Sequence, residues 1–174
     1  MKRYRRHRQD PAPIAGEKPE PATVRAAAPP LSILLVEDNP ADARLVSEFL
    51  DSPATTGRLS AVSDGEAAMD FLRRAGRYSE APRPDMVLLD LNLPVKNGLE
   101  VLAEIKGDPE LKRIPVVILT GSARSEDIAR AYELHANCYI IKPADIDDFA
   151  RMAKSLDDFW SKTAQLPEDS LHGR

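Results

Sequence analysis

Short apolar runs alternate along the chain with stretches that carry apolar residues at helical spacing. From Leu31 onward, runs rich in Val, Ile and Leu predict five β-strands, at residues 33–36, 58–62, 86–89, 116–119 and 139–141. The intervening stretches predict helices at about 41–50, 63–74, 97–106, 125–134 and 145–160. Strands that are apolar throughout are buried on both faces, which is typical of a parallel sheet. The alternation therefore predicts an α/β fold, a doubly wound, five-stranded parallel sheet built from five β–α units.

Polar residues with capping chemistry precede two of these helices. Ser63 is followed three residues later by Glu66, and Asn97 is followed at the same spacing by Glu100. Each pair fits the capping box, in which the first side chain accepts from the helix and the second reaches back. We therefore expect Ser63 and Asn97 to start the second and third helices.

The composition is that of a globular protein with an ordinary core. The 174 residues are 43% hydrophobic and 30% charged, and no apolar run approaches the ~18 residues that cross a membrane. No apolar segment follows the charged N-terminus as it does in a secretory signal. The single cysteine, Cys138, cannot form an internal disulfide and is interpreted as a small apolar residue. A cytoplasmic location is the resulting expectation.

Charge is distributed unevenly between the ends of the chain and its middle. Residues 1–30 contain seven Lys/Arg and three Asp/Glu and are rich in Pro and Ala, so we expect a disordered basic tail. Such a tail is either simply solvated, which we favour, or contacts anionic lipid, nucleic acid or an acidic partner. Residues 31–160 form the predicted domain and 161–174 a C-terminal extension. The acidic charge of the domain argues against direct nucleic-acid binding by the folded part.

Polar residues follow four of the predicted strands at the point where each strand ends. Glu37 and Asp38 follow the first strand, Asp90 the third, Thr120 the fourth and Lys142 the fifth. Ligands of open parallel sheets bind beyond the carboxyl ends of the strands, so these side chains are expected to share one crevice. Three close carboxylates repel one another and need a cation, and hard oxygen ligands suit Mg²⁺. Alternatively, the acidic pair on its own could be a turn and helix cap before Pro40.

Asp90 is the candidate nucleophile of this crevice. A carboxylate can attack phosphorus to give an aspartyl phosphate, a transfer that depends mainly on positioning and charge neutralisation. Lys142 would supply a positive charge to the phosphoryl oxygens, and a cis bond to Pro143 would aim its side chain into the crevice. Hydrogen bonds would come from the Thr120 hydroxyl and from main-chain N–H groups near Asn92 and Gly121.

These segments resemble the response-regulator receiver domains of two-component signalling over residues 33–160. The motifs are ILLVED (33–38), VLLDLNLP (87–94), VVILTGS (116–122) and YIIKPAD (139–145), in the family's order. The resemblance implies a flavodoxin-like receiver fold in which Asp90 accepts a phosphoryl group from a phosphohistidine of a sensor histidine kinase. It also implies that Thr120 moves toward that group and that Tyr139 swings inward behind it.

The resemblance further implies a magnesium site. Its ligands would be Glu37, Asp38, Asp90 and the main-chain carbonyl of Asn92. The acidic pair here is Glu-Asp, whereas Asp-Asp is the commoner form, and the longer Glu37 can act through a metal-bound water. A long connection over residues 73–85 and a long fifth helix are similar to the single-domain regulators that partner phytochrome-type kinases.

Output is expected through protein contacts, because residues 157–174 leave no room for a further domain. The fifth helix carries a core stripe of Ile146, Phe149, Ala153, Leu156 and Trp160. Met152 and Phe159 widen this stripe, which favours a homodimer through the helix with Trp160 as anchor; alternatively, the C-terminal extension folds back over it. The downstream protein is unknown. The phosphoryl donor must lie on another protein, because His7 and His172 fall in the tails and His135 is expected at a helix end.

Two alternatives compete with the receiver interpretation. A phosphohydrolase of the haloacid-dehalogenase type also uses an aspartate nucleophile, Mg²⁺, Thr and Lys. It requires a second Asp two residues after the nucleophile, where this chain has Asn92. The other alternative is a receiver-like binding module that is never phosphorylated. We expect a phosphoacceptor that assists its own phosphotransfer and dephosphorylation, and not a turnover enzyme.

Overall fold

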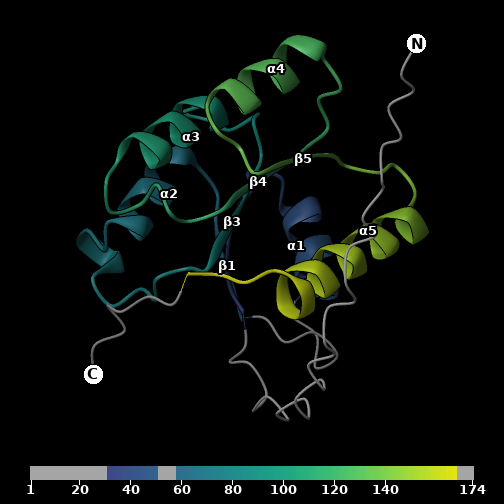
Figure 1. The fold of residues 1–174 in the computed structure, drawn as a ribbon, viewed down its shortest axis with the longest axis horizontal. Helices are drawn as coiled ribbons and strands as arrows, with labels where there is room; N and C mark the ends of the chain where they lie inside the picture. Colours follow the sequence, from purple (N-terminus) through teal and green to yellow (C-terminus); the bar gives the residue numbers. More distant parts are fainter. Residues whose placement is uncertain (1–30, 51–57, 168–174) are drawn as a thin grey trace, which may run out of the picture.

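The computed structural model describes residues 31–50 and 58–167, and the predictions for the basic tail and for 168–174 lie outside them. One parallel sheet has the strand order β2-β1-β3-β4-β5 (Figure 1). The strands are β1 (Ser32–Val36), β2 (Arg58–Val62), β3 (Met86–Leu89), β4 (Val116–Thr120) and β5 (Cys138–Ile141). The α-helices are α1 (Pro40–Leu50), α2 (Gly65–Leu72), α3 (Gly98–Gly107), α4 (Ser125–Glu133) and α5 (Ile146–Asp158). The predicted doubly wound (βα)5 sheet is confirmed. None of the helices in the described ranges is long and apolar enough to span a membrane.

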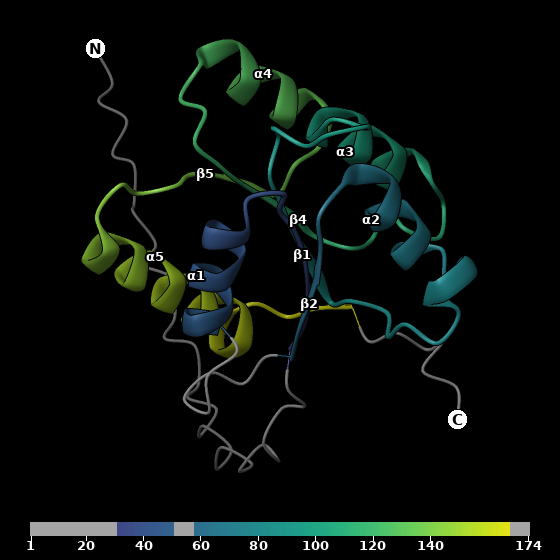
Figure 2. The ribbon, with the colours of Figure 1, turned by 180° about the vertical axis from the view of Figure 1, so that it is seen from behind.

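Two hydrophobic cores lie on opposite faces of the sheet. Helices α2, α3 and α4 cover one face and α1 and α5 cover the other, as Figures 1 and 2 show from opposite sides. Alternate residues of the interior strand β1 serve the two cores: Leu34 and Val36 face the first, and Ile33 and Leu35 face the second. Every residue of β3 and β4 is buried, because both faces of these strands are covered.

The strand register carries the sheet directly into the polar segments beyond it. Val36 of β1 is level with Leu89 of β3, so the next residue of each strand lies at the same edge. The main-chain N–H of Asp90 donates to the Val36 carbonyl (3.0 Å), and that of Lys142 donates to the Thr120 carbonyl (2.8 Å). These bonds extend the ladder by one residue, and they fix where the polar side chains begin.

One of the two predicted helix starts is confirmed. Asn97 accepts from the Glu100 N–H (3.0 Å) while the Glu100 carboxylate accepts from the Asn97 N–H (2.9 Å), a complete capping box. The prediction for Ser63 is wrong. Asp64 caps α2 instead, accepting from the Ala67 N–H at 2.7 Å. Asp64 is an equally good capping residue one position later, and its charge is favoured at a helix N-terminus.

The fifth helix differs from its predicted course at both ends. Phe149, Ala153 and Leu156 are buried as expected, but Ile146 is exposed, so its assignment to the core is wrong. Ile146 is the first residue of α5, and the helix packs against the sheet only from Phe149 onward. A π-helical turn, η2 (Phe159–Thr163), follows α5, and Leu166 beyond it packs against the second core.

The segment after η2 crosses the sheet at the end opposite to the polar residues. Leu166 and Pro167 line a small cleft with Pro84 and Ile114, which precede β3 and β4, respectively. Figure 1 shows this segment in yellow, passing the end of the sheet. The described part of the extension therefore packs against the end of the sheet and the second core, but it leaves Phe159 of the widened α5 stripe exposed.

Candidate phosphoacceptor site

Lys142 stands at the centre of the crevice beyond the strands. Its ammonium lies 2.6 Å from Glu37 Oε2, 2.6 Å from Asp90 Oδ2 and 2.8 Å from Asp42 Oδ2. Glu37 and Asp90 are buried, and Lys142 is nearly so. Residues from the ends of β1, β3 and β5 are thus joined by the ammonium group of Lys142.

Asp42 was missed by the sequence analysis. It lies in the first turn of α1, and it reaches the crevice because that helix starts at Pro40, immediately after the strand–helix loop. Acidic residues in a first helical turn commonly interact with the helix dipole alone, so the type of residue gave no distinctive signal. Its position shortly after an acidic pair was the only clue.

Thr120 and Asn92 hold the other oxygen of Asp90. The Thr120 hydroxyl donates to Asp90 Oδ1 (2.7 Å), and the main-chain N–H of Asn92 donates to the same oxygen (3.0 Å). With Lys142 on Oδ2, both oxygens of Asp90 are held in place. Such a carboxylate is preorganised, because its orientation costs nothing further at the moment of reaction.

The peptide bonds in the described ranges are all trans, so a cis Lys142–Pro143 bond is not what aims the lysine. Its side chain reaches the crevice from a trans backbone, because the strand end already points there. Gly121 is exposed, and a Cβ on it would meet nothing within 4 Å, which leaves its backbone open to a ligand. Asn92 is likewise exposed.

The two buried carboxylates respond differently to their shared partner. Burial is the main influence on Glu37 and, with the nearby charge of Asp90, raises its pKa despite the Lys142 ammonium. Burial also acts to raise the pKa of Asp90, but Lys142, the Asn92 N–H and the Thr120 hydroxyl outweigh it and lower that pKa. Burial acts to lower the pKa of Lys142, but hydrogen bonds to Asp42, Asp90 and Glu37 raise it overall. Asp90 is therefore ionised at neutral pH, and Lys142 is charged.

The donor set fits a divalent cation in its chemistry. Three carboxylates, from Glu37, Asp42 and Asp90, surround one ammonium, which leaves an excess of negative charge when all are ionised. In the described chain no three carboxylate, imidazole or thiolate groups stand in a ready metal-ligand arrangement, because Lys142 lies among the carboxylates. Asp38 is exposed beside Glu37, and the described carboxylates that contact Lys142 are those of Glu37, Asp42 and Asp90. A lysine on a flexible stem can move aside, so these oxygen ligands fit a divalent cation.

Tyr139 of β5 is level with Ile118 of β4 and is only partly buried. Its hydroxyl donates to the main-chain carbonyl of Ser122 at 3.1 Å, and its ring packs against the first core. Burial raises the pKa of Tyr139, and the carboxylates of Asp127 and Asp90 add to that shift. The sequence analysis had selected Tyr139 but had not selected Ser122, which no motif distinguishes.

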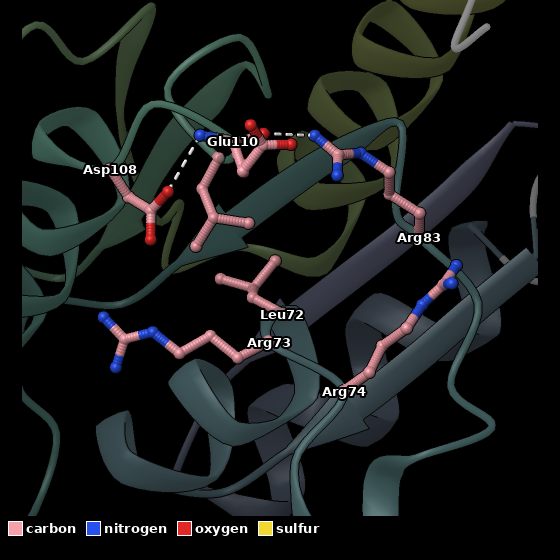
Figure 3. Close-up of a pocket in the computed structure, with 7 residues that line it drawn as sticks. Leu72, Arg73, Arg74, Arg83, Asp108 and Glu110 are labelled. Carbon is pink, nitrogen blue, oxygen red and sulfur yellow. Dashed lines mark hydrogen bonds between the residues drawn. The ribbon is translucent and has the colours of Figure 1, made fainter. Parts of the chain in front are cut away.

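Two further features lie outside this site. His135 directly follows the C-cap of α4, exposed and with φ +65°, as expected for a helix-terminal residue. A cavity of about 350 Å³ lies between the end of α2 and the turn after α3 (Figure 3). It is lined by Leu72, Arg73, Arg74, Arg83, Asp108, Glu110 and Leu111. None of the predicted site residues contributes to it.

Comparisons with known proteins agree with this geometry. Residues 33–154 match the family described as the response regulator receiver domain. The response regulator Rcp1 of Synechocystis sp. (strain ATCC 27184 / PCC 6803 / Kazusa) is 51% identical over 139 residues, which cover 80% of this chain and 95% of Rcp1.

Two crystal structures show the same likeness. The Mn²⁺-bound form of Rcp1 superposes with a TM-score of 0.75 at 51% identity, covering 79% of this chain and 99% of the other. The phosphorylated cyanobacterial phytochrome response regulator RcpA superposes with a TM-score of 0.76 at 51% identity, covering 79% and 98%. The family match spans most of the chain. The chain belongs to the response regulator receiver domain family, and it functions as a response regulator.

Proposed function

We propose that Asp90 is the residue that accepts the phosphoryl group. The main support for the proposal is that both carboxylate oxygens of Asp90 are hydrogen-bonded. The Thr120 hydroxyl and the Asn92 N–H donate to Oδ1, and the Lys142 ammonium donates to Oδ2. A carboxylate oxygen of Asp90 attacks the phosphorus of a phosphohistidine on a sensor kinase. The P–N bond breaks, its electron pair stays on the imidazole, and the P–O bond of an acyl phosphate forms.

A divalent cation, Mg²⁺ in the cell, would be held by Glu37, Asp38, Asp90 and the main-chain carbonyl of Asn92. When bound, it neutralises charge on the phosphoryl oxygens. The Mn²⁺-bound crystal structure of Rcp1, a 51% identical protein, supports this assignment. The protein's own part is to place the ligands, and to let Lys142 leave Glu37 and Asp42 for the phosphoryl group.

The response to phosphorylation would run through Thr120 and Tyr139. The Thr120 hydroxyl moves from Asp90 to a phosphoryl oxygen, and Tyr139 turns inward behind it. Both residues start from restrained positions, with bonds to Asp90 Oδ1 and to the Ser122 carbonyl. The face of α4, β5 and α5 would change as a result, and a downstream protein would recognise that change.

The proposed partners follow from the similar proteins described above. RcpA is titled a phytochrome response regulator, so a phytochrome-type histidine kinase is the proposed donor, acting in the cytoplasm where its ATP is available. A homodimer through α5 is part of the proposal, because Phe159 is exposed at the end of that helix. The domain spans residues 31–160 and would assist its own phosphotransfer and dephosphorylation without turning over a substrate.

Mass measurement tests the acceptor. Wild-type protein treated with acetyl phosphate and Mg²⁺ is expected to gain the mass of one phosphoryl group, and Asp90→Asn to gain none. Asp70→Asn, the same change at an exposed position of α2, is the matched control and should behave as wild type. An unmodified wild type would support a binding module, and a phosphorylated Asp90→Asn would refute the acceptor. Multiple turnovers on a generic phosphate ester would indicate a phosphohydrolase.

A further inference from the structure

Lys142 contacts three carboxylates, but only two of them belong to the proposed metal site. Its ammonium donates to Glu37 and Asp90, which follow β1 and β3, and to Asp42, which stands on α1. Glu37 and Asp90 are buried, whereas the Asp42 side chain is 35% exposed. Asp42 is therefore the carboxylate of these three that remains available to the lysine when a cation binds the proposed ligands.

Asp42 has a fixed position, because the start of α1 is well held. The Asn39 side chain accepts a main-chain bond from the first turn (2.9 Å), and the Asn39 N–H donates to Glu37 Oε1 (3.2 Å). Further along the helix, Val46 and Leu50 are buried in the second core. A negative charge in a first helical turn is also favoured by the helix dipole. Asp42 thus offers a carboxylate on a rigid support.

Lys142, by contrast, extends from the end of an edge strand. The strand β5 is partly exposed and pairs only with β4, and the Lys142 N–H continues that pairing to the Thr120 carbonyl (2.8 Å). A lysine side chain is flexible, so carboxylates must hold its ammonium in place. When Glu37 and Asp90 turn to a cation, the ammonium loses two of its three bonds and is repelled by the like charge.

We propose that Asp42 is a positioning residue that retains Lys142 in the crevice while a divalent cation occupies the site. The inference rests on the proposed function, because it takes Glu37 and Asp90 to be metal ligands. The ammonium shifts to Asp42 alone and stays within reach of an arriving phosphoryl group. It passes to the phosphoryl oxygens when Asp90 reacts. Because Asp42 offers the displaced lysine a partner, the site also accepts a cation more readily.

The test follows the Lys142 ammonium by NMR on protein with isotope-labelled lysine, before and after saturation with Mg²⁺. An ammonium held by carboxylates exchanges its protons slowly and gives a signal, which Lys142→Met identifies by its loss. In wild type the signal should persist with Mg²⁺. Asp42→Asn should keep the signal without Mg²⁺, when Glu37 and Asp90 remain as partners. Once Mg²⁺ is bound, its ammonium should exchange with water about fivefold faster than that of wild type.

Two further variants separate retention of the lysine from a general effect of charge. Asp42→Glu keeps the carboxylate and should restore the protected signal in the presence of Mg²⁺. Glu48→Gln removes one negative charge from the same helix, where Glu48 pairs with Arg44 (3.1 Å), and should behave as wild type. If Asp42→Asn does not fold, Asp42→Ser takes its place with the same expected loss, because serine also lacks the charge.

A second measurement is the affinity for Mg²⁺, followed by the amide chemical shift of Asn92. Asp42→Asn should bind Mg²⁺ about fivefold more weakly than wild type, because the displaced lysine has lost its alternative partner. Asp42→Glu should recover the wild-type affinity, and Glu48→Gln should not change it. An unchanged affinity in Asp42→Asn would overturn the role of Asp42 as a partner for the displaced lysine.

The outcomes separate this inference from the proposed function. A wild type whose Asn92 amide does not respond to Mg²⁺ overturns the proposed metal site and the retention with it. A wild type that binds Mg²⁺ but loses the Lys142 signal overturns the retention alone. An Asp42→Asn protein that binds Mg²⁺ and keeps a fully protected Lys142 signal does the same.

Discussion

The main chain of Asp90 lies directly against Gly98, the first residue of α3. A Cβ on Gly98 would stand 2.1 Å from the Asp90 carbonyl oxygen and 2.7 Å from Leu91 Cα, distances that real side chains do not adopt. The Gly98 N–H also donates to the Leu91 carbonyl (3.0 Å). The backbone of Asp90, the proposed phosphoacceptor, is thus supported by a helix that can approach only because it begins with glycine.

Gly98→Ala should therefore impair both folding and phosphorylation. The methyl group must push α3 away from the Asp90 main chain, which we expect to lower the free energy of unfolding by about 2 kcal/mol. Displacement of Asp90 should also slow its reaction with acetyl phosphate. Gly107→Ala is the matched control, because a Cβ there meets nothing and a helix prefers alanine. Chemical denaturation and the rate of mass increase measure the two effects; equal behaviour of both variants would contradict the explanation.

Lys142→Met should destabilise the metal-free protein and strengthen its binding of Mg²⁺. Removal of the ammonium leaves Glu37 and Asp90 buried without a cation, at an expected loss of about 3 kcal/mol in unfolding free energy. Because the lysine no longer competes for the carboxylates, added Mg²⁺ should restore most of that stability. Denaturation with and without Mg²⁺ measures both effects. Lys154→Met breaks an exposed pair with Asp158 and should change little. Stability of Lys142→Met unaffected by Mg²⁺ would argue against a cation site.

Glu37→Gln should make the metal-free protein more stable at neutral pH. Burial and the charge of Asp90 raise the pKa of Glu37 above its usual 4.5, so the fold favours the protonated form. That contribution to stability is full below the unfolded pKa and is lost as pH rises through the folded pKa. The glutamine side chain is neutral at every pH, so the variant retains this contribution to stability at neutral pH. Unfolding measured from pH 4 upward should show the variant's advantage growing as the wild-type carboxyl ionises. Glu48→Gln, an exposed carboxyl of α1, should show no such trend.

The strand ends and the cap of α3 were predictable because they depend on local sequence, whereas the cap of α2 was misplaced by one residue. Apolar runs bounded by polar residues gave β3 without error, and the spacing of Asn97 and Glu100 gave the capping box. Asp42 and Gly98 were not predictable, because their roles depend on how helices sit against the crevice. Burial of the first residue of α5 was misjudged for the same reason, since periodicity does not say where a helix meets its sheet.

Val95→Gly should stabilise the loop that follows Asp90. Val95 is 77% exposed and has φ +67°, a left-handed conformation that a β-branched side chain adopts only under strain. Glycine removes that strain and loses little packing, so an increase of about 1 kcal/mol in unfolding free energy is expected. Val95→Ala keeps a Cβ and should gain less than half as much. Denaturation curves decide the matter, and a destabilised Val95→Gly would show that the side chain has a packing role.

Phe159 is better placed for the proposed dimer contact than Trp160, the anchor expected from sequence. Trp160 is half-buried and packs against the second core, whereas Phe159 is 51% exposed beside it, in an edge-to-face contact with centroids 5.2 Å apart. Exposed aromatic side chains on a supported base are typical interface anchors. Phe159→Lys should therefore weaken a dimer by a factor of about 30 or more. Tyr132→Lys makes the same change at an equally exposed residue of α4, across the sheet, and should leave the dimer intact.

Sedimentation of the unphosphorylated and phosphorylated proteins over a range of concentrations measures this contact. A dimer that Phe159→Lys dissociates, and Tyr132→Lys does not, places the contact at the end of α5. If only Tyr132→Lys dissociates the dimer, the dimer contact lies on α4, on the opposite face of the sheet. A wild type that remains monomeric in both states removes the dimer from the proposal. It would leave Phe159 as a surface for a different protein, because folding alone gives no reason to hold an exposed aromatic ring against Trp160.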